Sequence, residues 1–208
     1  MPPPTGIFVV FEGGDGVGKS TQINAVRAWL DGGDQEVVVT REPGGTALGS
    51  ALRELVLHGE HLAARAEALI FAADRAHHVQ SVVRPALARG AIVLADRYQD
   101  SSIAYQGAGR DLDAREIAGL SAWATDGLLP DLTILLDLDP AIGLARRGPG
   151  GDRLEQEAAH FHDRVRARFL ELAAAEAGRY LVLDATLPPT EVTALICDRL
   201  AASVGTAR

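Results

Sequence analysis

Cysteine and lysine are almost absent from this chain. Among 208 residues there is one cysteine, Cys197, and one lysine, Lys19, while the other 19 of the 20 basic residues are arginine. A single cysteine excludes an internal disulfide, and with it a small secreted scaffold held by such bonds. Because Cys197 follows an apolar run, we expect it to pack in the core. A solitary lysine indicates a position that needs a compact ammonium group.

Long apolar runs are absent as well. The stretch 7–11 is too short for a signal peptide or a membrane span, and no charged segment precedes it, so we expect a cytoplasmic protein without a membrane partner. The formal net charge of −8 disfavours sequence-independent binding to nucleic acid or to an anionic membrane. The composition, 47% hydrophobic and 23% charged, is that of a globular protein, and the length predicts one domain over residues 1–208.

Short apolar runs alternate with segments of helical period along the whole chain. Continuous apolar runs are typical of parallel strands that are covered on both faces. Ile23, Val26 and Leu30 repeat with helical spacing, and the segment 154–172 predicts a long amphipathic helix. The chain is therefore predicted to form an α/β fold with a five-stranded parallel sheet and helices on both faces. The predicted strands are 7–11, 37–39, 91–95, 132–136 and 180–183.

Charged residues follow each predicted strand. Because the carboxyl ends of parallel strands meet at one edge of a sheet, where ligands bind in open α/β folds, we expect these side chains to gather at a ligand site. Polar strand ends without a function remain the alternative for any one of them. The residues are Glu12, Thr40 to Glu42, Asp96 with Arg97, Asp137 and Asp184.

The first strand leads into a glycine-rich loop and then a helix. The loop, Gly13-Gly14-Asp15-Gly16-Val17-Gly18-Lys19-Ser20 with Thr21 after it, has the spacing G-x-x-x-x-G-K-S of a P-loop. Glycines allow the main-chain N–H groups to point inward onto phosphate, and Lys19 adds a charge. The segment 13–21 is therefore predicted to bind ATP, with Lys19 in a catalytic role.

Magnesium is the metal that this loop chemistry implies. Ser20 offers a hydroxyl ligand, and Asp96 at the end of the third strand supplies a carboxylate. Asp96 could instead cap the following helix. Arg97 beside it is predicted to hold a second phosphate. The single lysine also excludes the Asn-Lys-x-Asp signature with which guanine-nucleotide switches read their base, which favours a kinase that acts on a nucleotide.

Three further segments resemble thymidylate kinases. They are Thr40-Arg41-Glu42-Pro43-Gly44-Gly45-Thr46, then Asp96-Arg97-Tyr98 with Ser101-Ser102-Ile103-Ala104-Tyr105-Gln106-Gly107, and the arginines 146, 147 and 153 before a long helix. The resemblance runs from about residue 8 to residue 200. It implies a three-layer P-loop fold with a short lid, and phosphoryl transfer from ATP to dTMP, giving dTDP and ADP with Mg²⁺. A kinase for another nucleoside monophosphate or a deoxynucleoside, or a P-loop switch, remains the alternative.

The resemblance also implies residues that bind the acceptor nucleotide. Phe71 is expected to stack on thymine, although its helical spacing also fits a core residue. Asp15 is expected to accept a hydrogen bond from the 3′-hydroxyl. The remaining implied contacts are Arg41 and Arg97 on the phosphate, Tyr98 against C2′ of the sugar, Arg75, Ser102 and Gln106 on the base or its neighbours, and Tyr105 in the same site.

The segment 146–153 is the predicted lid. Thymidylate kinases place a catalytic arginine either in the P-loop or in the lid, and since positions 14–17 contain no arginine, the resemblance assigns this chain to the lid-arginine subgroup. We expect Arg153 to contact the transferring phosphoryl group, with Arg146 and Arg147 next and Arg97 as a further catalytic residue. Adenine is expected near residues 184–188, with Arg146 beneath the ring. The resemblance also implies a homodimer, for which the segments 62–87 and 117–123 could supply the interface.

Overall fold

A parallel sheet forms the centre of the molecule. The computed structural model describes residues 6–148 and 151–206. The five strands are β1 (Ile7–Glu12), β2 (Val37–Arg41), β3 (Ile92–Asp96), β4 (Leu132–Asp137) and β5 (Tyr180–Asp184). They lie in the order β2-β3-β1-β4-β5, and every neighbouring pair is parallel. The predicted strands and fold class are therefore confirmed.

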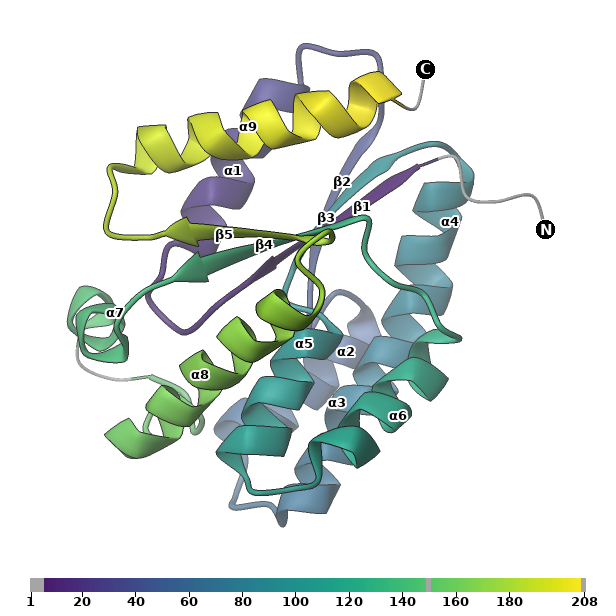
Figure 1. The fold of residues 1–208 in the computed structure, drawn as a ribbon. Helices are drawn as coiled ribbons and strands as arrows, with labels where there is room; N and C mark the ends of the chain where they lie inside the picture. The colour runs from purple at the N-terminus through teal and green to yellow at the C-terminus, as the bar shows by residue number, and fades with distance from the viewer. Residues whose placement is uncertain (1–5, 149–150, 207–208) are drawn as a thin grey trace.

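Helices cover both faces of this sheet (Figure 1). One face carries α1 (Lys19–Leu30) and α9 (Pro189–Thr206), and the other carries most of the remaining helices. These are α2 (Ala47–Arg53), α3 (Ala64–His78), α4 (Arg84–Ala88), α5 (Gln99–Ser102), α6 (Ala114–Thr125) and α8 (Ala159–Ala175). Wide π-type turns at Glu54–His58, Val79–Val83 and Ile103–Gly109 extend α2, α3 and α5. No helix within residues 6–148 and 151–206 is both long and apolar enough to cross a membrane.

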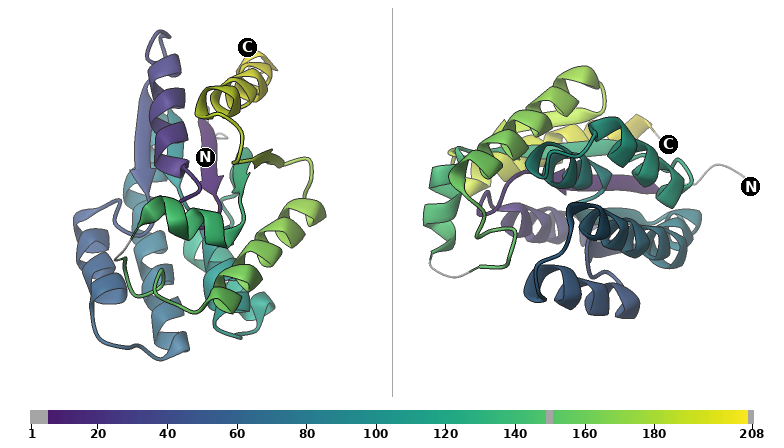
Figure 2. Two further views of the ribbon diagram at one scale, coloured as in Figure 1. Left: turned by 90° about the vertical axis from the view of Figure 1, so that its left-hand side faces the viewer. Right: turned by 90° about the horizontal axis from the view of Figure 1, so that it is seen from below.

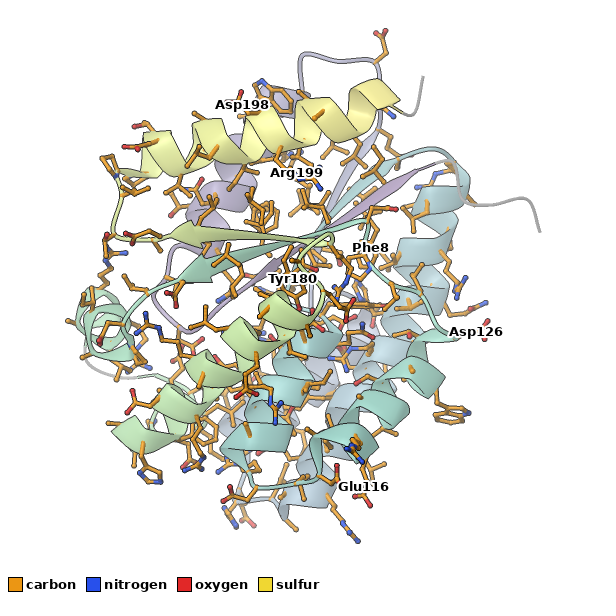
Figure 3. All side chains as sticks on the ribbon, viewed as in Figure 1. Phe8, Glu116, Asp126, Tyr180, Asp198 and Arg199 are labelled. Atoms are coloured by element: carbon orange, nitrogen blue, oxygen red, sulfur yellow. The ribbon has the colours of Figure 1, made fainter. Side chains whose placement is uncertain are left out.

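Alternate residues of β1 pack into two different cores. Val9 and Phe11 face the α1 and α9 side, where Cys197 is also buried, as predicted. Phe8 and Val10 face the opposite layer. Figure 3 shows Phe8 among side chains packed beneath the sheet, whereas the side chains of Glu116 and Asp126 extend outward. Burial on both faces explains why the strand reads as a continuous apolar run.

The carboxyl edge of the sheet is the end near α7 (Pro140–Arg147), which lies across it in the left view of Figure 2. The register confirms that the strand ends meet there: Arg41 is paired with Asp96, and Asp137 with Asp184. Not all of them face a ligand cavity. Asp137 binds Arg166, and the Asp184 carboxylate accepts from the turn at Thr186, so these two have structural roles.

The predicted helix over 154–172 begins later than expected. Asp152 accepts hydrogen bonds from the main-chain N–H groups of Leu154 and Glu155, which closes a separate turn, and α8 starts only at Ala159. Leu154 is still buried in the core cluster beside α8, although it does not belong to a helix. The apolar pattern therefore identified the buried positions correctly but placed the start of the helix five residues too early.

Candidate active site

One large cavity of about 480 Å³ opens at the carboxyl edge of the sheet. It brings together residues from the P-loop, the ends of β2 and β3, helices α2, α3 and α5, and the segment after α7. The predicted site residues that line it are Asp15, Gly16, Gly18, Lys19, Ser20, Thr21, Arg41, Phe71, Arg75, Asp96, Arg97, Tyr98, Ser102, Tyr105, Gln106, Arg146 and Arg147. Gly13, Gly14 and Val17 do not line this cavity. They line a smaller cavity together with residues of α7. Arg153 lines neither of these cavities.

The P-loop has the backbone conformation that a phosphate site requires. Gly13, Gly16 and Gly18 all have positive φ, which residues with a Cβ rarely adopt. A Cβ on Gly16 would lie 2.0 Å from the carbonyl oxygen of Gly143, so the first turn of α7 packs directly on the loop. Gly18 begins α1, and no side chain caps its first turn. The main-chain N–H groups at this helix start can therefore bind an anion.

Lys19 is held inside the loop. Its ammonium donates to the carbonyl oxygens of Gly13 and Gly14, at 3.2 and 2.8 Å. Burial lowers the pKa of Lys19, and the nearby Arg97 guanidinium lowers it further, whereas Asp96, Asp15 and Glu12 oppose the shift. A bound polyphosphate would favour the charged form of Lys19 and offer it stronger acceptors than carbonyl groups.

Asp96 and Ser20 both line this cavity, and they meet again in a second hollow beside β2. The Oδ1 atom of Asp96 is buried and has no hydrogen-bond partner among the residues described. The N-cap residue of α5 is Tyr98, so Asp96 does not cap that helix and the alternative is wrong. Glu12 has this role instead, since its carboxylate accepts from the main-chain N–H groups of Tyr98 and Ser101. A free carboxylate oxygen near a hydroxyl fits a magnesium ion whose other ligands are phosphate oxygens and water.

Arg97 connects the P-loop to Tyr105, which also lines the cavity. Its backbone has φ 69°, in the left-handed region that non-glycine residues rarely adopt. Its guanidinium donates to the carbonyl of Gly13, to the carboxylate of Asp15 and to the hydroxyl of Tyr105. Tyr105 in turn donates to Asp15 at 2.8 Å. Burial raises the pKa of Asp15, but the Arg97 and Lys19 charges and the Tyr105 hydrogen bond outweigh this and hold it below its ordinary value.

Two more arginines, Arg41 and Arg53, line the cavity. Arg41 at the end of β2 is exposed, and its guanidinium forms no hydrogen bond within the ranges described. Arg53 was missed from the sequence. It ends α2 and donates to the carbonyl of Pro43, and burial together with the charge of Arg41 lowers its pKa. Because the chain has 19 arginines, an arginine alone is no signal of a site. Only the closeness of Arg53 in sequence to the segment 40–46 could have suggested it.

The far end of the cavity is lined by Phe71, Arg75, Ser102 and Gln106. Phe71 is 8% exposed and belongs to the core cluster, as the alternative predicted; it also lines the cavity, so stacking on thymine stays a prediction. Arg75 is almost completely buried. It donates to Glu42 at 2.8 Å, to Ser121, to the carbonyl of Tyr98 and to Ser102. This end is therefore rigidly held by hydrogen bonds within the protein.

Tyr98 does not fit the predicted contact with a sugar. Its side chain is completely buried, its ring packs edge-on against Phe8, and its hydroxyl donates to the carbonyl of Leu128. The residue reaches the cavity wall, yet its ring lies in the core beneath the sheet. Tyr105 is the tyrosine whose hydroxyl reaches the P-loop carboxylate.

Two buried acids hold side chains around the cavity: Glu42, which the sequence predicted only as one of the charged strand ends, and Glu67, which it missed. Glu42 bridges Arg75 and His78, and Glu67 binds Gln106, Arg110 and Arg153. Both carboxylates are fully or nearly fully buried. Glu67 lies within the helical segment that contains Phe71, and nothing in its spacing distinguishes it from a surface acid. Its partners come from distant segments of the chain, which the sequence alone does not reveal.

The three lid arginines have different positions. Arg146 donates to the carbonyl of Ala185, in the loop where adenine is expected. Arg147 lines the cavity 2.8 Å from the carboxylate of Glu155, and its Nε has no hydrogen-bond partner among the described residues. Arg153 instead donates to the carbonyl of Val56 and to Glu67, outside the cavity. Positions 149–150 of the predicted lid lie outside the described residues.

Comparison with known proteins gives a consistent result. The family model described as thymidylate kinase matches residues 11–203. A thymidylate kinase of Clavibacter michiganensis is 61% identical over 204 residues, which cover 96% of this chain and 97% of that protein. One from Thermosynechococcus vestitus is 48% identical over 96% of this chain and 89% of that protein. The crystal structure of thymidylate kinase from Ehrlichia chaffeensis superposes with a TM-score of 0.79 at 33% identity, covering 93% of this chain and 97% of that one.

Proposed function

The chain belongs to the thymidylate kinase family, and from this premise we propose that its cavity holds dTMP against the terminal phosphate of ATP on the P-loop. The enzyme phosphorylates dTMP to dTDP. The observation that carries the assignment of the cavity is that the start of α1, Lys19 and the arginines 41, 53 and 97 all face one space. Such a space suits two phosphate groups that must meet.

The acceptor phosphate belongs beside Arg41, Arg53 and Arg97. Guanidinium groups match phosphate oxygens with paired hydrogen bonds, and Arg41 has all of its donors free among the described residues. The sugar then lies over Asp15 and Tyr105. Asp15 has a lowered pKa, so it is ionised and can accept a hydrogen bond from the 3′-hydroxyl. Tyr105 takes the place beside the sugar that the sequence assigned to Tyr98.

The base belongs at the closed end of the cavity. Phe71 supplies an aromatic face for stacking, while Arg75, Ser102 and Gln106 supply polar contacts for the edge of the ring. Because Arg75 and Gln106 are already held by buried carboxylates, the base meets side chains whose positions are fixed before it binds. Such preorganisation reduces the entropy that binding must otherwise overcome.

Phosphoryl transfer needs positioning and charge stabilisation more than covalent help from the protein. The main-chain N–H groups of residues 13–21 hold the ATP phosphates, and Lys19 neutralises them. Arg147 reaches the transferring group from the lid, because it lines the cavity and Arg153 does not. Ser20 and Asp96 would hold Mg²⁺, which when bound neutralises charge on the phosphates. The acceptor phosphate is already an anion, so no general base is required.

The test is an ADP-release assay with ATP, Mg²⁺ and a panel of acceptors: dTMP, dUMP, dCMP, dGMP and thymidine. We expect dTMP to be the best acceptor. A better rate with another acceptor would show that the base-end assignment is wrong. ATP turnover that no monophosphate stimulates would instead support a nucleotide switch.

The enzyme is also proposed to form a homodimer. Leu69 of α3 is 59% exposed and Trp123 of α6 is 81% exposed, in two helices that pack against each other. Large apolar side chains exposed on neighbouring helices are typical of a surface that another molecule covers. Light scattering of the purified protein tests this directly. We expect a dimer, and we expect Trp123→Ser to weaken it.

A further inference from the structure

Glu67 lies behind the base end of the cavity and does not line it. Its side chain has no exposed surface, and it belongs to α3, one turn before Phe71. A buried carboxylate is costly unless it is fully paired. Glu67 has three partners, and two of them are arginines, Arg110 and Arg153. Its third partner, Gln106, is a neutral side chain that lines the cavity.

The bond between Glu67 and Gln106 determines which way the Gln106 amide points. The side-chain nitrogen of Gln106 donates to Glu67 at 3.0 Å. An ionised carboxylate can only accept hydrogen bonds, so the amide atom that faces it must be the NH₂ group. The other amide atom, Oε1, accepts no hydrogen bond from any residue in the described ranges. The cavity is therefore offered an acceptor at this position.

Arg110 and Arg153 help to keep the Glu67 carboxylate ionised. Burial raises the pKa of Glu67, but the hydrogen bonds from Gln106, Arg153 and Arg110 outweigh burial and hold the pKa below its ordinary value. The carboxylate is thus ionised at neutral pH and cannot donate a proton to the oxygen of Gln106. Arg153, at the end of the predicted lid segment, is one of these donors to Glu67, and it does not line the cavity.

We propose that Glu67 is a positioning residue that sets base specificity by holding the Gln106 amide with its oxygen toward the cavity. This inference rests on the proposed function. Thymine carries an N–H donor at N3, which an acceptor oxygen can bind. Cytosine has an acceptor at N3, and two acceptors facing each other leave both unsatisfied. The arrangement therefore favours a thymine edge over a cytosine edge without any contact between Glu67 and the nucleotide.

The test compares dTMP with 5-methyl-dCMP, because the two nucleotides differ only on the edge of the base that includes N3. The measured quantity is the ratio of their kcat/KM values. In Glu67→Gln the residue can donate as well as accept, so the Gln106 amide is free to turn over. We expect the ratio to fall at least about tenfold, with the kcat for dTMP changing less than its KM.

A matched control and a rescue accompany this variant. Glu157 is a second carboxylate bound to Arg110, but it does not touch Gln106, so Glu157→Gln should leave the ratio within about twofold of wild type. Combining Glu67→Gln with Gln106→Glu makes position 106 an acceptor only, and the ratio should recover. A wild-type ratio in Glu67→Gln, or an equal fall in Glu157→Gln, would overturn the proposal.

A crystal structure of the wild-type chain with dTMP tests the same proposal without any variant, in case Glu67→Gln does not fold. We expect Gln106 to keep its bond to Glu67 while its other amide atom faces N3. A Gln106 side chain that has left Glu67 in that complex would overturn the inference. If the wild-type chain does not phosphorylate dTMP at all, the proposed function fails; if it does and the ratio resists Glu67→Gln, only this inference fails.

Discussion

The two ends of the cavity are built in opposite ways. At the phosphate end, the first turn of α1 has no side-chain cap and Arg41 has free donors among the described residues. At the base end, Arg75 and Gln106 are tied to buried carboxylates. The phosphate end therefore keeps donors free for an anion, whereas buried carboxylates hold Arg75 and Gln106 at the base end in place before a ligand binds. Substitutions at the phosphate end should therefore lower turnover, and substitutions at the base end should lower stability or specificity.

The largest effect that we expect comes from breaking the base end. Glu42→Ala removes the carboxylate that pairs with Arg75 and His78 and leaves a buried guanidinium uncompensated. The free energy of unfolding should fall by about 3–5 kcal/mol. Urea unfolding of the ligand-free protein measures it. Glu36→Ala, which removes an ion pair with Arg89 on the surface, is the matched control and should change stability little. Equal stability of the two variants would contradict the contrast between the two ends.

Breaking the phosphate end should leave stability nearly intact and remove activity. Lys19→Ala should lower kcat by about 10²–10³-fold, the scale of one preorganised charged donor. Because burial already lowers the pKa of Lys19, its removal relieves a desolvation cost in the free protein. Steady-state kinetics and thermal unfolding on the same samples test both statements. Turnover near that of wild type would refute the role of the P-loop.

Two of the three lid arginines, Arg147 and Arg153, sharpen the comparison further. Arg147→Ala should lower kcat by about 10–10²-fold with little change in the KM for dTMP, because its contact forms mainly in the transition state. Arg153→Ala should act through Glu67, so we expect a higher KM for dTMP and a weaker preference over 5-methyl-dCMP, with a smaller change in kcat. If Arg153→Ala lowers kcat more than Arg147→Ala does, the original assignment from the sequence is restored.

The smallest effect concerns Glu12, which lies where β1 enters the P-loop. Burial and the nearby Asp100 raise its pKa from 4.5 to about 7. Between these pH values the folded chain binds more protons than the unfolded chain, so this group makes the free energy of unfolding fall as pH rises. Glu12→Gln removes that contribution. The stability of the variant relative to wild type should therefore increase from pH 5 to pH 8, by on the order of 1 kcal/mol. Urea unfolding at several pH values gives the slope, and parallel slopes would contradict the raised pKa.

The sequence predicted those parts of the molecule that are encoded locally. The strands are continuous apolar runs, and the P-loop is one unbroken segment, so both could be read residue by residue. Glu67 was missed because its importance depends on partners far along the chain: it meets Arg153 across 86 positions. Arg53 was missed because nothing in the sequence distinguishes it from the other arginines. Tyr98 was placed beside the sugar by the resemblance alone, as part of the segment Asp96-Arg97-Tyr98. The backbone turns at Arg97, however, and the Tyr98 ring enters the core instead.

The solitary lysine has a practical consequence. Reagents that acylate primary amines can modify only two kinds of group in this chain, the terminal amine and the Lys19 side chain. Since Lys19 is 8% exposed inside the P-loop, its modification in the native protein should be slow and should stop when nucleotide covers it. The mass increment on the single peptide that contains Lys19 would then report occupancy of the loop directly, without a label on the nucleotide.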